Sequence, residues 1–314
     1  MLDSGNMYDL IIIGAGPAGA GAGVYAARKK MDVLVLTKDF LGQSAVSEKI
    51  YNWIGTPEIS GIELSKNLEK HLRFYEKKNG GSLEIESGIS VSGVSVIEKG
   101  EFLVTDNKNK NWQTKNVLIC SGSSRKKLSV PGANEYDGKG IVYCATCDGP
   151  LFSDMDVAVI GGGNAGFESA MQLLAYCKSV TLLHRNNEFR ADPLVIEKVL
   201  AHKNMHTLRN VDIKKVSGDK FVNSLEYQEK DTGEVKKLEI QGIFVEIGQV
   251  PNTNFLANIV DLDEFGKIKV DPWTMRSSLC GIWAAGDCTN VKYHQNNIAT
   301  GDAVKAVEDI YQQK

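Results

Sequence analysis

Proline is scarce in this sequence, with 7 prolines among 314 residues, whereas glycine is abundant at 31. A disordered or collagen-like chain is rich in both residues, so the composition excludes those two classes. Hydrophobic residues make up 42% and charged residues 24% of the chain, as in ordinary globular proteins. At ~150 residues per domain the length predicts about two domains, each large enough to bury its own core.

The chain also lacks an excess of basic charge. It has 36 Lys and Arg against 39 Asp and Glu, which gives a net charge of −3. Nucleic-acid-binding proteins usually show a strong basic excess, so we expect no nucleic-acid partner. Six cysteines in a chain of this length are too few for a disulfide scaffold.

A convincing membrane segment is missing as well. Residues 10–27 form a stretch of 18 without a charge, near the lower limit for a membrane helix. The stretch holds Pro17 and five glycines, however, and its apolar bulk is confined to residues 10–13. The first ten residues contain Asp3 and Asp9 and no basic residue, which argues against a secretory signal. We therefore expect a cytoplasmic protein without a membrane span.

The sequence contains the same strand–loop–helix–strand pattern twice. Residues 8–13 are an apolar run that enters GAGPAG at 14–19, and a helical stretch to about 29 and a strand at 32–36 follow. Residues 156–160 enter GGGNAG at 161–166, followed by a helix to about 176 and a strand at 179–183. The two glycine loops begin about 147 residues apart, so the pattern indicates an internal repeat of a nucleotide-binding fold.

Other stretches predict the surrounding elements. Residues 62–78 predict an amphipathic helix, and residues 298–311 predict a C-terminal helix. Residues 83–120 and 211–247 predict short strands, with a hairpin turn at 231–233. The candidates for the inner side of the first of these helices are Ile62, Leu64, Leu68, Leu72 and Tyr75.

Each glycine of the Gly-x-Gly-x-x-Gly loop has a steric role. The first allows the tight turn, the second lets the backbone approach a pyrophosphate, and the third lets helix and strand pack closely. The pyrophosphate lies at the helix N-terminus, where free N–H groups and the helix dipole favour an anion. Two such loops in the required context therefore predict two dinucleotide sites, the alternative being glycine-rich packing loops without a ligand.

The end of the second strand in each repeat distinguishes the ligands. Many such folds place an acid there to bind a ribose hydroxyl, but the first repeat has Thr37. The second repeat has His184 and Arg185, with Arg190 following, and cations at this position suit the 2′-phosphate of NADP. The alternative is an exposed basic turn.

Cys144 and Cys147 form the one Cys-x-x-Cys motif of the chain. A structural zinc site needs two more ligands at similar spacing, so we expect no metal and favour a redox-active dithiol. Asp148 follows directly and is a candidate proton donor or acceptor. The alternative is a pair of buried cysteines. We expect the other four cysteines to be small buried hydrophobes, namely Cys120, Cys177, Cys280 and Cys288.

Two dinucleotide sites and a dithiol in one chain suggest a flavin between them. A nicotinamide delivers hydride, whereas a disulfide is reduced through thiolate chemistry, and a flavin is the usual relay. The first glycine loop would then bind FAD.

At this point the sequence resembles the low-molecular-weight thioredoxin reductases, from Tyr8 to Tyr311. It is also similar to the reductase half of the alkyl hydroperoxide reductase flavoprotein. The resemblance is carried by GAGPAG at 14–19, Gly42-Gln43, Asn52-Trp53, CATCDG at 144–149, GGGNAG at 161–166, HRNNEFRA at 184–191, Ile247-Gly248 with Pro251-Asn252, and AAGDC at 284–288.

The resemblance implies an α/β fold of two Rossmann-like three-layer nucleotide-binding domains, the second inserted into the first. Residues 1–123 and 249–314 would form the FAD domain, and residues 124–248 the NADPH domain that carries the dithiol. It also implies a homodimer that passes electrons from NADPH through FAD and the dithiol to thioredoxin. Cys147 would face the flavin, Cys144 would attack the disulfide of the partner, and Asp148 would be the general acid.

The resemblance further implies two sets of cofactor contacts. Those on the FAD side are Gly14, Ala15, Gly16, Pro17, Thr37, Gly42, Gln43, Asn52, Gly122, Gly286, Asp287, His294 and Gln295. Those on the NADPH side are Gly163, Asn164, Ala165, His184, Arg185, Arg190, Ile247 and Gly248.

Some positions depart from the family pattern. The second of two arginines after the family's histidine is Asn186 here, which removes one 2′-phosphate contact and leaves the choice between NADPH and NADH open. The family's Arg-Gln pair near the flavin is His294 and Gln295. The family's Gly-Gly-Gln loop is Leu41-Gly42-Gln43 here, and its Ala-Thr-Gly strand end is Cys120-Ser121-Gly122.

Other functions stay open beside the leading one. The acceptor could be a glutaredoxin-like or peroxidase-linked protein, and the donor could be NADH or ferredoxin. A ferredoxin–NADP reductase of the same fold lacks the Cys-x-x-Cys motif and is disfavoured. A non-catalytic flavoprotein redox sensor is a further alternative, although it would need neither a donor site nor a dithiol.

Overall fold

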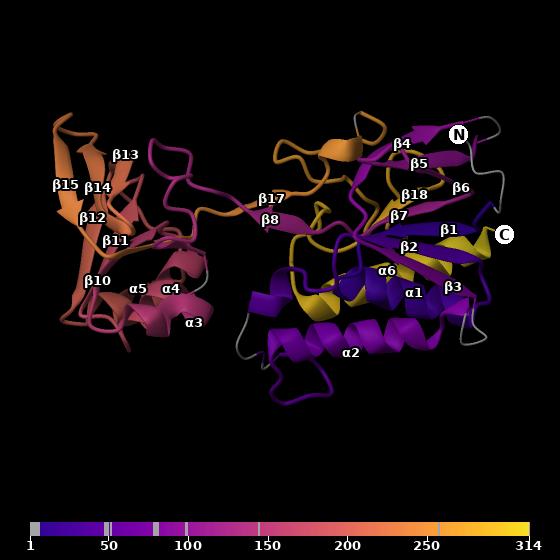
Figure 1. Cartoon of the computed structure of the whole chain (residues 1–314), viewed down its shortest axis with the longest axis horizontal. Helices are drawn as coiled ribbons and strands as arrows, with labels where there is room; N and C mark the ends of the chain where they lie inside the picture. Colours follow the sequence, from indigo (N-terminus) through magenta and orange to yellow (C-terminus); the bar gives the residue numbers. More distant parts are fainter. Residues whose placement is uncertain are drawn as a thin grey trace. The chain divides into compact units, whose positions relative to one another are not determined.

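The computed structural model describes residues 7–46, 50, 52–77, 82–97, 100–143, 145–256 and 258–313, without the side chains of Val46, Thr146 and Cys147. Cys144, the side chain of Cys147 and the expected helix end at Lys78 therefore lie outside the described residues. The chain divides into two compact units (Figure 1). The first unit comprises residues 1–124 and 250–314, and the second comprises residues 125–249.

A parallel sheet forms the centre of the first unit. Its strands, in spatial order, are β18 (Ile282–Ala284), β7 (Val117–Ile119), β1 (Leu10–Ile13), β2 (Val33–Thr37) and β3 (Leu83–Ser87). All residues of β1 and β2 are buried, as expected for parallel strands that are covered on both faces. The apolar runs that predict these strands in the sequence are thus explained by burial on both sides.

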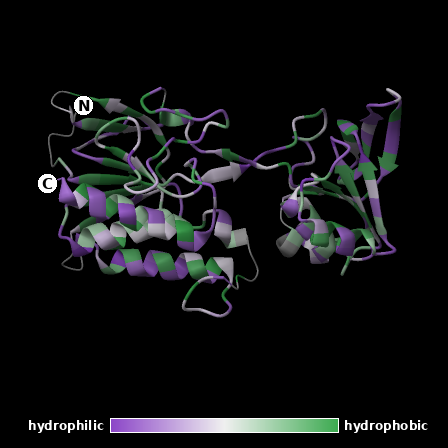
Figure 2. Ribbon diagram, turned by 180° about the vertical axis from the view of Figure 1, so that it is seen from behind, coloured by the Kyte–Doolittle hydropathy of each residue, from purple (hydrophilic) through white to green (hydrophobic). Residues whose placement is uncertain are grey.

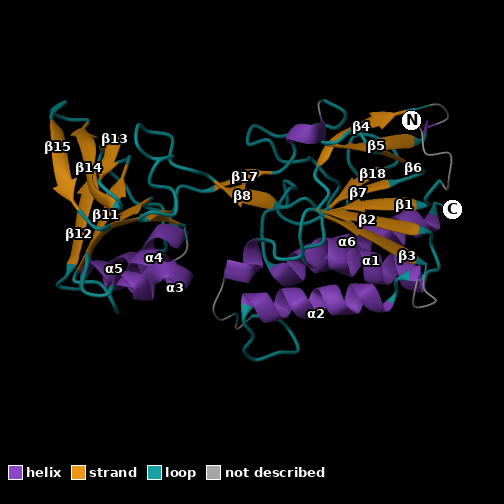
Figure 3. Ribbon diagram, in the orientation of Figure 1, coloured by secondary structure: helices purple, strands orange, loops and turns teal. Residues whose placement is uncertain are grey.

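Helices cover one face of this sheet, and a small antiparallel sheet covers the other (Figures 1 and 3). The helices are α1 (Pro17–Arg28), α2 (Gly61–Phe74) and α6 (Asn296–Gln312). The antiparallel strands are β4 (Val91–Val96), β5 (Phe102–Asp106) and β6 (Asn111–Thr114).

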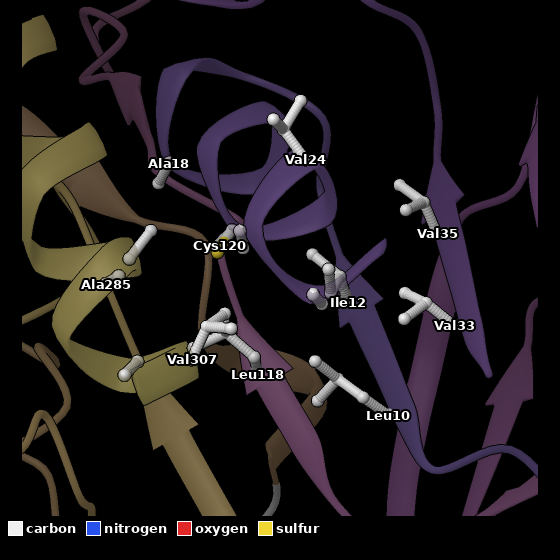
Figure 4. Close-up of a cluster of buried hydrophobic side chains, with 14 of the residues drawn as sticks. Leu10, Ile12, Ala18, Val24, Val33, Val35, Leu118, Cys120, Ala285 and Val307 are labelled. Atoms are coloured by element: carbon white, nitrogen blue, oxygen red, sulfur yellow. The ribbon is translucent and has the colours of Figure 1, made fainter. Parts of the chain in front are cut away.

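Alternate residues of each central strand serve the two faces. Leu10 and Ile12 point toward α1 and α6 with Val35 of the neighbouring strand (Figure 4). Ile11 and Ile13 pack instead with the apolar residues of β4, β5 and β6. This period of two is what a strand requires when both of its faces are buried.

Helix α2 is amphipathic, as predicted, and Figure 2 shows alternating hydrophobic and hydrophilic bands along the helices of this unit. Leu64 and Leu72 are buried, but Ile62 is 51% exposed, so its assignment to the inner side was wrong. The helix begins at Gly61 with Ser60 as its N-cap. Because each residue advances by about 100°, Ile62 lies about 200° from Leu64 and faces outward.

The second unit repeats the three-layer arrangement. Its parallel sheet has the order β12 (Met205–Arg209), β11 (Ser179–His184), β10 (Asp156–Ile160), β16 (Gly242–Val245) and β9 (Ile141–Val142). Its helices are α3 (Ala145–Asp148), α4 (Asn164–Leu173) and α5 (Pro193–Leu200). The antiparallel strands are β13 (Val211–Gly218), β14 (Val222–Glu229) and β15 (Val235–Glu239), with the expected hairpin between β14 and β15.

The core of the second unit follows the same alternation. Val157 and Val159 of β10 pack with the residues of α4 and α5, and Ala158 and Ile160 pack with those of β13 and β14. The chain passes between the units through β8 (Ser123–Arg125) and β17 (Gln249–Pro251), which pair with each other. The predicted fold class is confirmed: both units are Rossmann-like α/β structures, and the second is inserted into the first. Within the described part of the chain, every helix is too short or too polar to cross a membrane.

Candidate functional site

The first glycine loop, residues 14–19, joins β1 to α1. Gly14 has φ +103°, and a side chain there would overlap the Cys120 carbonyl oxygen. A side chain at Gly19 would overlap the carbonyl of Gly14, so this glycine lets α1 pack against the loop. Gly16 is different, because a methyl group on it would meet no heavy atom of the described residues within 4 Å.

The second glycine loop, residues 161–166, joins β10 to α4. Its three motif glycines have the same steric roles as those of the first loop. Gly161 has φ +130° and faces the Glu246 carbonyl, where a side chain would collide. Gly166 packs against the carbonyl of Gly161. A methyl group on Gly163 would again meet no described heavy atom within 4 Å apart from those of its chain neighbours.

In both loops the open glycine is also the N-cap of the helix, Gly16 for α1 and Gly163 for α4. A glycine has no side chain to cap the helix, so the N–H groups of the first turn are available to an external acceptor. Helix N-termini with this arrangement bind phosphate groups. The residues of both loops therefore fit the pyrophosphate of a dinucleotide.

Several predicted FAD contacts from distant parts of the chain lie together in the first unit. Gly286 follows β18 with φ +80°, and a methyl group on it would lie 3.4 Å from the Cβ of Ala18 in α1. Asp287 is therefore close to the first glycine loop. Asn52 Nδ2 donates to Gln295 Oε1 at 2.9 Å, across 243 residues of sequence.

His294 and Gln43 join the same region through polar contacts. His294 Nδ1 lies 3.4 Å from Asp287 Oδ1, and its Nε2 lies 2.9 Å from Lys267 Nζ. Gln43 Nε2 donates to the carbonyl of Ser123 at 2.6 Å, directly after Gly122. No sequence motif points to Lys267, because its contact with His294 arises only in the folded chain.

Thr37 ends β2 beside this loop and offers little to a ligand. Its side chain is buried, and its Oγ1 donates to the Asp39 carbonyl at 2.6 Å. Asp39 Oδ1 in turn accepts from the backbone N–H of Gly42 at 3.3 Å. The polar groups at this strand end thus stabilise the following turn. Ala15 and Pro17, also predicted contacts, lie within the glycine loop, and Pro17 is the first residue of α1.

The predicted nicotinamide-dinucleotide contacts surround the second glycine loop. The backbone N–H of Arg190 donates to the Gly162 carbonyl at 2.8 Å, which places Arg190 beside Gly163. Asn164 Oδ1 accepts from the backbone N–H of Asp192 at 2.8 Å. His184 Nδ1 accepts from the Gly162 N–H at 3.2 Å.

The remaining members of this set lie at the ends of neighbouring elements. Ala165 is in the first turn of α4, and Arg185 follows β11, where Lys230 Nζ donates to its carbonyl at 2.7 Å. Ile247 and Gly248 follow β16, and the Gly248 carbonyl accepts from the Lys126 N–H at 2.9 Å. The structure thus gathers this predicted set at one edge of the parallel sheet.

The described part of the Cys-x-x-Cys motif lies in α3, which packs against α4. Asp148, at the end of α3, is half-buried. Burial raises the pKa of its carboxyl group, and the nearby Arg125 guanidinium opposes part of that rise. A carboxyl group with a raised pKa keeps its proton to a higher pH, which suits a proton donor.

Two further charged residues, one acidic and one basic, were missed in the sequence. Glu246 follows β16 with its side chain largely buried, and burial raises its pKa although Ser169 Oγ donates to it at 2.7 Å. Arg125 Nη1 lies 4.0 Å from Glu246 Oε1. Arg125 lies on β8, and its positive charge opposes the rise in the pKa of both Asp148 and Glu246. The sequence does not reveal the effect of Arg125, because Glu246 lies 121 positions later in the chain.

The other cysteines mostly follow expectation. Cys120, Cys177 and Cys288 are buried, and burial raises the pKa of Cys177 and Cys288 to about 11. Cys280 is exposed, so its assignment as a buried residue was wrong. It precedes Gly281 in the tight turn that enters β18, where φ is +89°, and such turns lie at the surface. Among the described residues, no group of three potential His, Cys, Asp or Glu metal ligands comes together.

A family model described as pyridine nucleotide-disulphide oxidoreductase matches residues 8–303. The NADH dehydrogenase of Bacillus subtilis is 35% identical over 312 residues, which cover 95% of this chain and 57% of the relative. The F component of the Escherichia coli alkyl hydroperoxide reductase is 35% identical over 308 residues, covering 97% and 58%. The chain thus spans less than three fifths of the length of these relatives.

Solved thioredoxin reductases match over nearly the whole chain. The enzyme of Lactococcus lactis gives a TM-score of 0.84 at 32% identity and covers 97% of this chain and 98% of its own. The enzyme of T. acidophilum gives 0.82 at 34% identity, covering 98% and 99%. The predicted resemblance is confirmed, and the family implies a flavin and a pyridine nucleotide as cofactors. The chain belongs to the pyridine nucleotide-disulphide oxidoreductase family.

Proposed function

We propose that this chain is a thioredoxin-disulfide reductase that uses FAD, NADPH and the Cys144–Cys147 dithiol. One observation carries the proposal. The chain matches the T. acidophilum thioredoxin reductase over 98% of its length at 34% identity, and the described part of its Cys-x-x-Cys motif lies in a helix packed against α4, the helix of the second glycine loop. A dithiol next to a nucleotide-binding helix is the arrangement that a disulfide reductase needs.

In this proposal the first unit binds FAD and the second binds NADPH. The first glycine loop is followed by Thr37, whose hydroxyl is used by its own turn, so the second strand provides no ribose-binding acid at that position. The second loop is bordered by Arg190, and Arg185 directly follows β11. Two guanidinium groups suit the 2′-phosphate that distinguishes NADPH from NADH.

The residues of this chain would bind and orient the cofactors and handle protons. The flavin and the nicotinamide, when bound, supply the two-electron chemistry. The N–H groups that begin α1 and α4 would hold the two pyrophosphates. Asp148 would donate a proton to the thiolate that leaves when a disulfide is reduced, because burial raises its pKa and keeps it protonated longer as pH rises.

An anaerobic titration tests this proposal. The FAD-loaded protein is titrated with NADPH and separately with NADH while the flavin absorbance is followed, and oxidised thioredoxin is then added. We expect NADPH to bleach the flavin at lower concentration than NADH, and thioredoxin to restore the colour. Cys144→Ser and Cys147→Ser should each abolish turnover with thioredoxin while retaining FAD. Full turnover in either variant would overturn the dithiol role.

A second candidate is a peroxidase-linked reductase that uses NADH. It is favoured by the match to the F component of alkyl hydroperoxide reductase and by Asn186, which leaves one arginine fewer for a 2′-phosphate. Bleaching by NADH ahead of NADPH, with recoloration by a peroxiredoxin-type disulfide and not by thioredoxin, would establish this candidate. Bleaching only by reduced ferredoxin would identify another donor, and bound FAD without any turnover would revive the redox-sensor alternative.

We also propose that the chain forms a homodimer through its first unit. Large apolar side chains are exposed on and beside α2, including Leu41, Ile54, Ile62 and Phe74. Ile62 and Phe74 are on α2 itself, and exposed apolar side chains gathered on one part of a surface are typical of a protein interface. Light scattering coupled to size-exclusion chromatography should give twice the chain mass. Phe74→Glu should shift the protein toward the monomer, and an unchanged mass would exclude this face.

A further inference from the structure

The imidazole of His184 uses both of its nitrogens inside the protein. Its Nδ1 accepts from the backbone N–H of Gly162 at 3.2 Å, and its Nε2 lies 2.9 Å from the Glu188 carbonyl oxygen. A backbone N–H only donates and a carbonyl oxygen only accepts, so the ring is neutral and carries its proton on Nε2. The residue is 7% exposed. The ring therefore has no polar atom left for a ligand.

His184 contacts Gly162, which lies between the first and second motif glycines of the second loop. Gly162 is in van der Waals contact with the ring, and any side chain on it would collide with His184 and with Phe189. The Phe189 ring lies 5.6 Å from the His184 ring and 4.9 Å from that of Phe167 in α4. The segment 184–190 thus closes over the loop and fixes the peptide that precedes Gly163.

We propose that His184 is a positioning residue whose neutral imidazole holds the Gly162 peptide, and through it Gly163 and the start of α4, ready for the pyrophosphate of a nicotinamide dinucleotide. This inference rests on the proposed function of the second unit as a nicotinamide-dinucleotide site. It replaces the expectation that His184 touches the cofactor. It applies equally to NADPH and NADH, because both carry the same pyrophosphate.

Protonation of the ring would break this arrangement. An imidazolium presents an N–H at both positions, so its Nδ1–H would face the N–H of Gly162. The charged groups near the ring are Arg185, Arg190 and Lys230, which disfavour a fourth cation in addition to the effect of burial. Burial and these cations lower the pKa of His184 below its usual value, although the Glu188 carbonyl opposes them. Binding should accordingly weaken as pH falls through that lowered pKa.

The alternative role predicts the opposite pH dependence. If His184 were a ligand of the 2′-phosphate, protonation would tighten NADPH binding and leave NADH unaffected. NADH is the decisive ligand, since it has no 2′-phosphate that itself titrates near pH 6. The two roles are therefore separated by the sign of the effect and by which nucleotide shows it.

The experiment measures the dissociation constants of NADPH and NADH for the FAD-loaded full chain between about pH 8 and about pH 5.5. In the wild type both constants should rise together on acidification. His184→Leu should raise both about tenfold at pH 8, equivalent to ~1.4 kcal/mol, and remove the pH dependence of the NADH constant. His184→Asn keeps an acceptor that cannot titrate, so both constants should stay within about threefold of the wild type at pH 8, and the NADH constant should show no pH dependence.

His206→Asn, on the exposed side of the neighbouring strand β12, is the matched control and should behave as the wild type does. Selective loss of NADPH binding in His184→Leu, or tighter NADPH binding by the wild type at low pH with NADH unchanged, would overturn the positioning role. Failure of both nucleotides to bind the wild type at any pH would instead overturn the proposed function, and the positioning role with it.

Discussion

Replacing Gly163 with alanine should weaken nicotinamide-dinucleotide binding without unfolding the second unit. Gly163 has φ −97° and ψ −175°, an extended conformation that alanine adopts freely. The added methyl group would meet no described atom within 4 Å. Alanine is a poorer N-cap than glycine, but the difference is about 1 kcal/mol or less. The variant should therefore fold and retain its FAD.

The expected loss of affinity arises because the methyl group occupies space needed by the pyrophosphate. It projects into the space that the second glycine of this motif leaves free for a pyrophosphate. Losing one charge-assisted hydrogen bond between a helix N–H and a phosphate oxygen costs ~1.5–3 kcal/mol. Since ~1.4 kcal/mol is a factor of ten, the dissociation constant should rise about 10- to 150-fold. NADPH and NADH should be affected alike.

The assay is the anaerobic titration of wild type and Gly163→Ala at equal flavin content. Two other glycine-to-alanine variants serve as comparisons. Gly166→Ala brings its methyl group against the Gly161 carbonyl, so it should destabilise the second unit itself. Gly16→Ala, the equivalent change in the first loop, should lose FAD. A Gly163→Ala variant that binds NADPH within twofold of the wild type, or that loses FAD, would refute the reasoning.

Three further changes test other parts of the structure. Arg125→Gln removes the cation that lowers the pKa of Asp148, so this acid stays protonated to higher pH and the alkaline limit of turnover should move upward; an unchanged pH profile of kcat/KM would contradict this. Asp309→Ala removes the acceptor of the Trp283 indole N–H and should destabilise the first unit by about 1–3 kcal/mol in urea unfolding, whereas an unchanged midpoint would exclude that contribution. In the double variant lacking Cys144 and Cys147, a thiol reagent should label Cys280 alone in the native state, because the other three thiols are buried; mass spectrometry shows whether a second site reacts.

The glycine loops can be located from the sequence because the first and third glycines of each motif are required by local steric constraints. Gly14 and Gly161 need positive φ, and Gly19 and Gly166 leave no room for a Cβ. Such demands depend on neighbours within a few residues or on an adjacent strand end, so they leave a motif. The strands and most helices are predictable for the same reason, since their period of two or 3.6 is written into consecutive residues.

The rest of the candidate site depends on contacts that leave no local pattern. Arg125 and Glu246 meet only because β8 and the end of β16 lie side by side, and Lys267 meets His294 only in the folded first unit. Cys280 is exposed because it lies in a turn, whereas the other described cysteines are buried. The residue type alone does not reveal this difference. Prediction therefore ends where side chains far apart in sequence determine one another's environment.

The two repeats diverge at one equivalent residue. The Gly14 N–H donates to the Leu36 carbonyl at 2.8 Å, and the Gly161 N–H donates to that of Leu183 at 3.0 Å, so the next residues, Thr37 and His184, occupy matching positions. Thr37 directs its hydroxyl proton to its own turn, whereas His184 reaches back to the glycine loop.

A threonine hydroxyl does not titrate in the physiological range, but a histidine does. Acidification should therefore weaken binding at the second loop while the first loop keeps its ligand. The glycines of the two loops have the same steric roles, so the residue at this matching position is the difference that pH should expose. We therefore expect the protein to retain its flavin at a pH where the binding of both nicotinamide dinucleotides has weakened.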